Sequence, residues 1–121
     1  MLVLSSLGTA SLAMIVAGGA AQPSQLVVPQ CLYYFGSEGC HSCEVADAYI
    51  TQVEAQYPTL TVHRFEVHNI TNWNLMVSFY RAHNMTFYST PVAFIGNEVL
   101  TGSADIENRL VPLILNNTGW P

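Results

Sequence analysis

Four segments after residue 30 have the apolar pattern of β-strands. The first is an aromatic run that ends at Gly36, which is typical of a buried strand. The second alternates between apolar and polar residues, with one break in phase near Arg64. The third is wholly apolar, and Gly96-Asn97 forms a turn into the short fourth. We therefore predict strands over residues 31–35, 60–67, 92–95 and 98–100.

Three other segments place their apolar residues on one face at helical spacing. In the first, Ala46, Ile50 and Val53 share such a face. Ser103 is the expected N-cap of the last helix, because its hydroxyl can accept a bond from a free backbone N–H. Pro112 is expected to kink that helix or to end it early. The predicted helices cover residues 43–57, 72–84 and 104–115.

The order of these elements predicts the fold class. It reads β-α-β-α-β-β-α, so a helical crossover joins the first two strands, which should then be parallel. The last two strands form an antiparallel hairpin. The result is an α/β fold with a mixed sheet and helices on both faces, in one small domain over residues 31–116. Residues 117–121 are assigned to a short tail.

The N-terminal segment, residues 1–21, contains no charged residue and predicts a hydrophobic helix ahead of the domain. Its length, as a helix, is about that of a bilayer core, which favours a retained membrane anchor. Gly19 and Ala21 are small residues at the −3 and −1 positions of a signal-peptide cleavage site, which favours removal. A buried core helix and the last span of a longer membrane protein are the other readings. Residues 22–30 contain two prolines and read as a linker.

The composition excludes several classes of function. Only 9% of the 121 residues are charged, the formal net charge is −5, and the three basic residues are all arginines. Nucleic-acid binding and polybasic contact with a membrane surface both need clustered Lys and Arg, which this chain lacks. We therefore predict no nucleic-acid partner, and contact with a membrane only through residues 1–21.

The motif Cys40-His41-Ser42-Cys43 follows the first strand and opens the first helix. Free N–H groups at a helix N-terminus favour a thiolate at Cys40, and the thiolate is the nucleophile in disulfide exchange. Cys43 lies one turn further in, where it can resolve a mixed disulfide. His41, if protonated, would stabilise the thiolate further; otherwise it is a solvent-exposed spacer beside Ser42.

Other uses of two cysteines at this spacing fit less well. Covalent haem attachment requires a histidine at position 44, which is Glu44. A structural zinc site needs four ligands, and only Cys40 and Cys43 with His63 or His68 could be assembled. A purely structural disulfide gains little from closing a two-residue loop. We therefore predict a redox pair, with no metal and no cofactor.

The strand, the Cys40–Cys43 motif, the amphipathic helix and Thr90-Pro91 before a later strand together resemble the thioredoxin superfamily. Residues 89–110 are similar more specifically to glutaredoxins, in which a cis-proline precedes a strand-turn-strand, followed by a glycine and an Asp-containing helix start. The resemblance covers residues 32–115.

This resemblance implies further site residues. Thr90-Pro91 should be cis, pack against the two cysteines and offer the Thr90 backbone to an extended substrate. Gly102, Ser103 and Asp105 are the implied ligand-binding turn. The chain departs from thioredoxins at Tyr34, where those proteins carry a buried acid. It also lacks the lysine expected of a glutathione clamp.

The remaining features are three possible glycosylation sites and a third cysteine. Asn69, Asn84 and Asn116 each begin an N-glycosylation sequon, which agrees with a site outside the cytoplasm. Cys31 is either a buried thiol or a third redox-active or intermolecular thiol.

The sequence thus predicts an extracytoplasmic thiol–disulfide oxidoreductase, membrane-anchored or secreted. Its partners would be protein or small-molecule thiols and disulfides, and a membrane electron-transfer protein. The alternative is a non-catalytic thioredoxin-fold module that binds a metal ion or a client protein.

Overall fold

The structure, a computed structural model, describes residues 28–120. Its centre is a four-stranded sheet in the order β2-β1-β3-β4. β1 pairs in parallel with β2, whereas β1 with β3 and β3 with β4 are antiparallel. The expected mixed sheet is therefore confirmed, with the crossover and the hairpin where the element order placed them. The strands are β1 (Gln30–Gly36), β2 (Leu60–Glu66), β3 (Val92–Ile95) and β4 (Glu98–Thr101).

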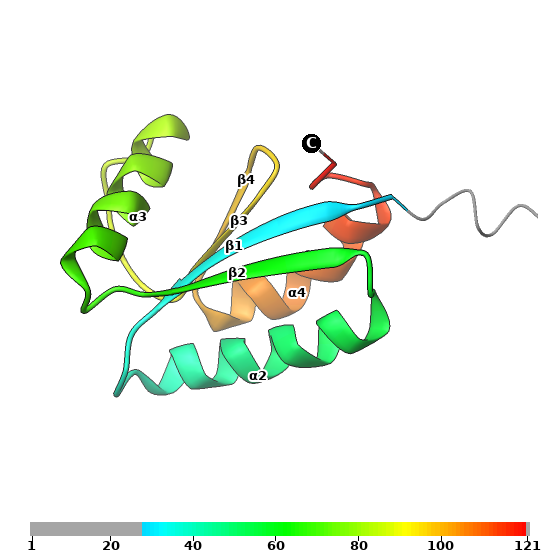
Figure 1. Ribbon diagram of the computed structural model, residues 1–121, viewed down its shortest axis with the longest axis horizontal. Coiled ribbons are helices and arrows are strands. Elements are labelled where there is room, and N and C mark those ends of the chain that lie inside the picture. The colour runs from blue at the N-terminus through cyan, green and yellow to red at the C-terminus, as the bar shows by residue number, and fades with distance from the viewer. Residues whose placement is uncertain (1–27, 121) are drawn as a thin grey trace, which may run out of the picture.

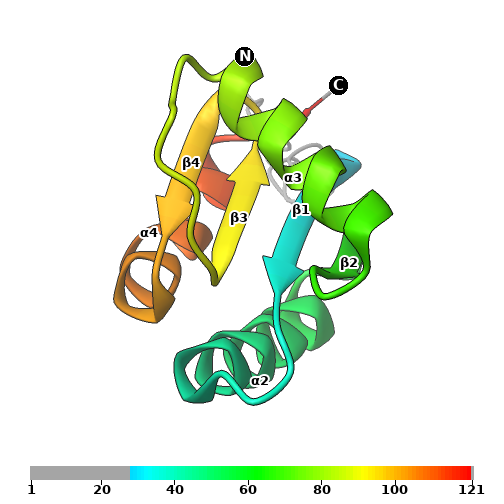
Figure 2. The same cartoon turned by 90° about the vertical axis from the view of Figure 1, so that its left-hand side faces the viewer.

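The helices cover both faces of this sheet, as expected. α2 (His41–Gln56) and α4 (Ser103–Leu115) lie side by side on one face, and α3 (Ile70–Ala82) covers the other (Figures 1 and 2). Among the described residues, no helix has the length and apolar character needed to cross a membrane. The hydrophobic helix expected at residues 1–21 and most of the linker expected at residues 22–30 lie outside the described residues.

Two hydrophobic cores result from the alternation of side chains along β1. Leu32 points toward α2 and α4 and joins a core of aliphatic residues that includes Ile50 and Leu110. Phe35 points the other way, into a core rich in aromatic rings beneath α3 that includes Tyr80 and Phe94. Each of these side chains has 1% or less of its surface exposed. Burial of one such side chain contributes about 1.5–3 kcal/mol, so both faces of the sheet stabilise the position of β1.

The last helix differs from the expectation at its start, whereas it ends at Leu115, as the pattern predicts. Ser103 is not the N-cap; it is the first helical residue, and Gly102 precedes it as the cap with φ +87°. Pro112 does not end the helix, which continues to Leu115. A proline inside a helix removes one N–H, so the carbonyl of Asn108 loses its partner four residues on. Asn108 is exposed, and water can satisfy that carbonyl.

The C-terminal residues pack against the start of the sheet. The buried Gln30 side chain donates to the carbonyl of Ile114 at 2.9 Å and accepts from the N–H of Gly119 at 3.0 Å. Both ends of the described chain therefore lie at one end of the molecule. The loop that connects β1 to α2 and leads to the two cysteines lies at the opposite end (Figure 1).

Candidate functional site

A disulfide joins Cys40 and Cys43 at the first turn of α2, with 5.2 Å between their Cα atoms. Cys40 is the N-cap residue, and its Sγ accepts a hydrogen bond from the Cys43 N–H at 3.1 Å. Cys40 is half-buried, whereas Cys43 is only 4% exposed. In the reduced state, the same N–H and the positive end of the helix dipole favour a thiolate at Cys40. The geometry therefore provides one accessible sulfur and one shielded sulfur.

The two residues between the cysteines differ in their surroundings. The His41 side chain is 90% exposed, and its Nδ1 lies 4.0 Å from a carboxylate oxygen of Glu44. The Ser42 hydroxyl lies 3.6 Å from Cys40 Sγ. Of the two side chains, that of Ser42 is the one in contact with the accessible sulfur.

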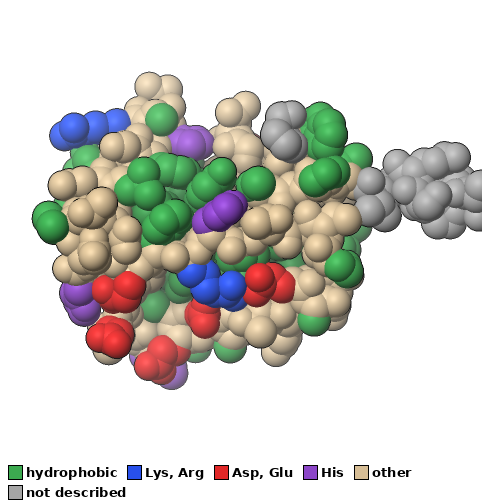
Figure 3. Space-filling view, in the orientation of Figure 1, with side chains coloured by type: hydrophobic (Ala, Val, Ile, Leu, Met, Phe, Trp, Pro, Cys, Tyr) green, Lys and Arg blue, Asp and Glu red, His purple; other side chains and the backbone are tan. Residues whose placement is uncertain are grey.

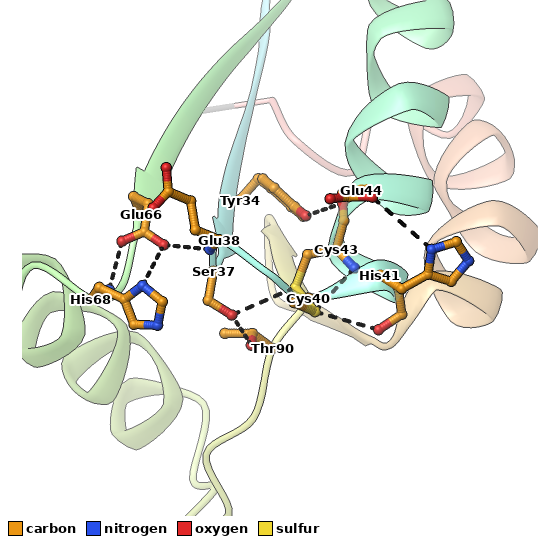
Figure 4. Close-up of a disulfide and its surroundings, with 11 residues drawn as sticks. Tyr34, Ser37, Glu38, Cys40, His41, Cys43, Glu44, Glu66, His68 and Thr90 are labelled. Atoms are coloured by element: carbon orange, nitrogen blue, oxygen red, sulfur yellow. Dashed lines mark hydrogen bonds and ion pairs between the residues drawn. A yellow bond between two sulfur atoms is a disulfide. The ribbon is translucent and has the colours of Figure 1, made fainter.

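The Thr90–Pro91 peptide bond is cis, as the resemblance implies, and Pro91 is buried. β1 and β3 pair with Phe35 opposite Val92, so the same register brings Ser37 opposite Thr90 just beyond the paired residues. The hydroxyl oxygens of Ser37 and Thr90 lie 3.3 Å apart, and Ser37 Oγ lies 3.9 Å from Cys43 Sγ (Figure 4). The structure thus brings the segment before β3 against the shielded cysteine.

Tyr34 occupies the position where thioredoxins carry a buried acid. Its side chain is 4% exposed, and its hydroxyl donates a hydrogen bond to the carbonyl of Cys43 at 2.9 Å. Burial raises the pKa of Tyr34 to about 12; the charge of Asp47 adds to this rise, and that of Arg64 opposes it. Tyr34 therefore stays protonated at neutral pH. It holds the first turn of α2 as a donor and does not replace the acid as a base.

A cleft of about 300 Å³ opens beside Cys43, between β1, β2 and α2. At this edge Arg64 binds Asp47 at 2.6 Å and Glu54 at 2.9 Å, and Figure 3 shows acidic side chains on either side of the basic ones below β2. The guanidinium is thus already paired. The charged residues that line the cleft are Glu38, Glu44, Asp47, Arg64 and Glu66.

Glu66, at the end of β2, braces the loop that leads to Cys40. Its carboxylate accepts the N–H of Glu38 and the N–H of His68, each at 2.7 Å. The bond from the Glu38 N–H is the main cause that lowers the pKa of Glu66, with smaller help from His68. This carboxylate links the cysteine loop to the edge of the sheet (Figure 4).

The turn that the resemblance implies for ligand binding is hydrogen-bonded to the cis-proline. Gly102 donates its N–H to the carbonyl of Pro91 at 2.8 Å. The Asp105 carboxylate accepts from the Thr101 N–H at 3.0 Å and from Arg109 at 3.1 Å, and Ser103 opens α4. The Asp105 carboxylate is thus engaged within the chain, and its role toward a ligand stays a prediction.

The histidines considered as zinc ligands have other contacts. His63 stacks on Tyr33, and His68 lies 3.3 Å from Glu66. Within residues 28–120 there is no group of three or more His, Cys, Asp or Glu side chains arranged to hold a metal ion.

The remaining predicted residues lie away from the disulfide. Asn69, Asn84 and Asn116 are exposed, and the Asn69 side chain caps α3 by accepting from the Asn72 N–H at 3.1 Å. Cys31 is a half-buried free thiol in a small cavity on the α3 side of the sheet. Glycosylation of the asparagines and a redox role for Cys31 stay predictions.

The sequence reasoning missed Ser37 and Glu66 as parts of the site. Ser37 lies three residues before Cys40, directly after the first strand. Its position opposite Thr90 could have been found only from the pairing register of β1 with β3. Glu66 is the last residue of its strand, and nothing in the local pattern distinguishes it.

No protein-family model and no curated protein matches this chain. Among solved structures, it is similar to a buckwheat glutaredoxin in complex with glutathione, with a TM-score of 0.53. The match covers 82% of this chain and 89% of the glutaredoxin, at 17% sequence identity. This likeness shows the fold: the described domain has a thioredoxin-like, glutaredoxin-like fold, with a disulfide between the two cysteines of its Cys-x-x-Cys motif.

Proposed function

We propose that this protein is a thiol–disulfide oxidoreductase that works outside the cytoplasm. The observation that carries the proposal is the disulfide at the N-terminus of α2, with Cys40 half-buried and Cys43 only 4% exposed. One sulfur can meet a substrate, while the other stays shielded until a mixed disulfide forms. Protein or small-molecule thiols and disulfides are the substrate class.

The reduced protein would act in two steps. The Cys40 thiolate attacks a substrate disulfide, forms a mixed disulfide and releases the first substrate sulfur as a thiolate. Cys43 then loses its proton to solvent and attacks Cys40 Sγ. The bond between Cys40 and the substrate breaks, and its electron pair leaves on the second substrate sulfur. The substrate gains two electrons, the protein regains its disulfide, and the same steps in reverse oxidise a substrate dithiol.

The segment before β3 is the proposed docking edge for a polypeptide substrate. Thr90 is half-buried at the end of the antiparallel pairing between β1 and β3, and its hydroxyl contacts Ser37, which contacts the shielded sulfur. An extended substrate chain that pairs with the Thr90 backbone would bring its own sulfur close to Cys40. Gly102, which donates to Pro91, would support this edge from behind.

Trapping of the mixed disulfide tests the roles of the two cysteines. In the full chain, Cys43→Ser should accumulate a mixed disulfide at Cys40, whereas Cys40→Ser should accumulate none. Cys40 should also be alkylated by iodoacetamide well below the pH of about 8.5 at which an ordinary thiol is half ionised. Cys31→Ser is the matched control, because it removes the cysteine distant from the site. Faster alkylation of Cys43 would reverse the assignment, and no exchange in the wild type would favour a binding module instead.

The location outside the cytoplasm is part of the same proposal. It is supported by the uncharged residues 1–21 and by the three exposed sequon asparagines. The described chain begins at the end of the domain opposite the disulfide, so residues 1–21 precede the domain on the side remote from Cys40 in the fold. A membrane-impermeant maleimide added to intact reduced cells should label Cys40. Labelling only after lysis would place the domain in the cytoplasm.

A further inference from the structure

The shielded sulfur of Cys43 has a neighbouring hydroxyl group that comes from outside the Cys40–Cys43 motif. Ser37 Oγ lies 3.9 Å from Cys43 Sγ, within range of a hydrogen bond to sulfur. By contrast, the accessible sulfur of Cys40 already accepts the Cys43 N–H and lies near the Ser42 hydroxyl. The two sulfurs therefore have separate partners in the structure.

Thr90 holds the Ser37 hydroxyl in place. The two hydroxyl oxygens are 3.3 Å apart, and both side chains are half-buried. A hydroxyl has one hydrogen to donate and two lone pairs to accept with. When Thr90 donates to Ser37, the Ser37 hydrogen is free to point at Cys43 Sγ. With that orientation, the two contacts drawn in Figure 4 would form a chain of donors from Thr90 through Ser37 to the shielded sulfur.

A hydrogen-bond donor to Cys43 Sγ would stabilise the thiolate that the second step of the proposed reaction requires. Cys43 must become a thiolate there, and its burial disfavours a charge. The nearby carboxylates disfavour it further, and Arg64 is already paired with Asp47 and Glu54. Tyr34 donates to the carbonyl of Cys43, away from the sulfur. The charged residues that line the cleft together with Cys43 are Glu38, Glu44, Asp47, Arg64 and Glu66.

We propose that Ser37, oriented by Thr90, donates a hydrogen bond to the Cys43 thiolate as it attacks the mixed disulfide. The inference rests on the proposed function and adds a catalytic residue to it. The proton of Ser37 stays on its oxygen throughout. The proton that Cys43 loses goes to solvent, and the electron pair of its thiolate forms the new bond to Cys40.

The test separates the two steps of the reaction in the full chain. Single-turnover measurements with a peptide disulfide give the rate of mixed-disulfide formation, and its decay gives the rate of resolution. For Ser37→Ala we expect resolution to slow about tenfold, since a hydrogen bond to a charged atom is lost. Formation of the mixed disulfide, measured in the Cys43→Ser background, should change less than about twofold. The acidic limb of the pH–rate profile for resolution should move to higher pH.

Three variants make the interpretation specific. Ser37→Thr keeps the hydroxyl and should restore most of the resolution rate. Thr90→Val removes the orienting hydroxyl while leaving Ser37 in place, and should slow resolution more than formation; it also serves if Ser37→Ala fails to fold. Ser78→Ala is the matched control, because within residues 28–120 the exposed Ser78 hydroxyl donates only to the carbonyl of Asn74 on α3.

An unchanged resolution rate in both Ser37→Ala and Thr90→Val would overturn the inference. Equal slowing of both steps would also overturn it, since it would indicate a distorted loop and not a lost donor to Cys43. If the wild-type protein shows no disulfide exchange, the proposed function itself is wrong. That result is obtained before any Ser37 variant is made, so the two failures are distinguishable.

Discussion

Replacement of Tyr34 by phenylalanine removes one buried oxygen beside the first turn of α2 and keeps the aromatic ring. In the wild type, that hydroxyl joins β1 to the first turn of α2 through the carbonyl of Cys43, at 2.9 Å. Because Cys43 is inside α2, its carbonyl keeps a backbone partner in the helix. The variant therefore loses one hydrogen bond without leaving a buried acceptor wholly unpaired.

The structure sets the size of this loss at neutral pH. A buried neutral hydrogen bond contributes about 0.5–1.5 kcal/mol net, so the free energy of unfolding should fall by about 1 kcal/mol. For a domain of this size, that corresponds to a fall in Tm of about 4–8 °C. Urea denaturation should show a lower midpoint with an unchanged slope. Tyr49→Phe is the control, because no hydrogen bond of its hydroxyl is found within residues 28–120.

Alkaline pH gives a second readout of the same substitution. The pKa of Tyr34 is about 12 in the folded protein, against 10.0 for an unperturbed tyrosine. Between these values the unfolded chain loses this proton and the folded one keeps it, so the stability of the wild type falls as pH rises. The Tyr34 contribution is up to about 1.4 kcal/mol per pH unit, and Tyr34→Phe should lack it. A loss at neutral pH no larger than that of Tyr49→Phe, or an unchanged alkaline slope, would refute this reasoning.

Two further substitutions test the loop and the C-terminal packing. In Glu66→Gln, the free energy of unfolding should depend less on pH in the acid range. The folded pKa of Glu66 is lowered, mainly by the Glu38 N–H, so its contribution is present above about pH 4.5 and is lost as pH falls through the folded pKa. Urea midpoints at neutral pH and at about pH 3 should therefore differ less in the variant, and an equal difference would contradict the prediction. Gly96→Ala should destabilise the domain by more than the roughly 1–2 kcal/mol that the left-handed backbone alone costs, because its Cβ would overlap the carbonyl oxygen of Thr118. Gly39→Ala is the matched control, since Gly39 also has a positive φ but open space around it; similar losses in thermal unfolding would show that the contact with Thr118 is unimportant.

The sequence alone predicted the elements and their order. An aromatic run before Gly36, helical spacing after Cys43 and the turn at Gly96 are local signals, because each depends on neighbours a few residues away. The Cys40–Cys43 pair at a helix start follows from the same local pattern. The location outside the cytoplasm and the function of residues 1–21 stay predictions, since the described residues do not test them.

The last helix shows where local sequence signals do not predict the structure. Ser103 is a good capping residue and Pro112 a good helix breaker, yet Gly102 caps α4 and the helix continues past the proline. Packing decides the second point. Ile106, Leu110 and Ile114 are all buried in the core beneath the sheet, and that burial stabilises a helix across the proline.

Only the tertiary structure decided which side chains meet at the shielded sulfur. Ser37 and Thr90 are 53 positions apart in sequence, and they face each other because β1 pairs with β3 in one register. A shift of that register by one residue would turn Ser37 to the other face of the sheet. The register depends on how the two cores pack on either side of β1, which is a property of the whole fold. The chain therefore carries the redox motif in four adjacent residues, but assembles the surroundings of its sulfurs from strands and loops far apart in sequence.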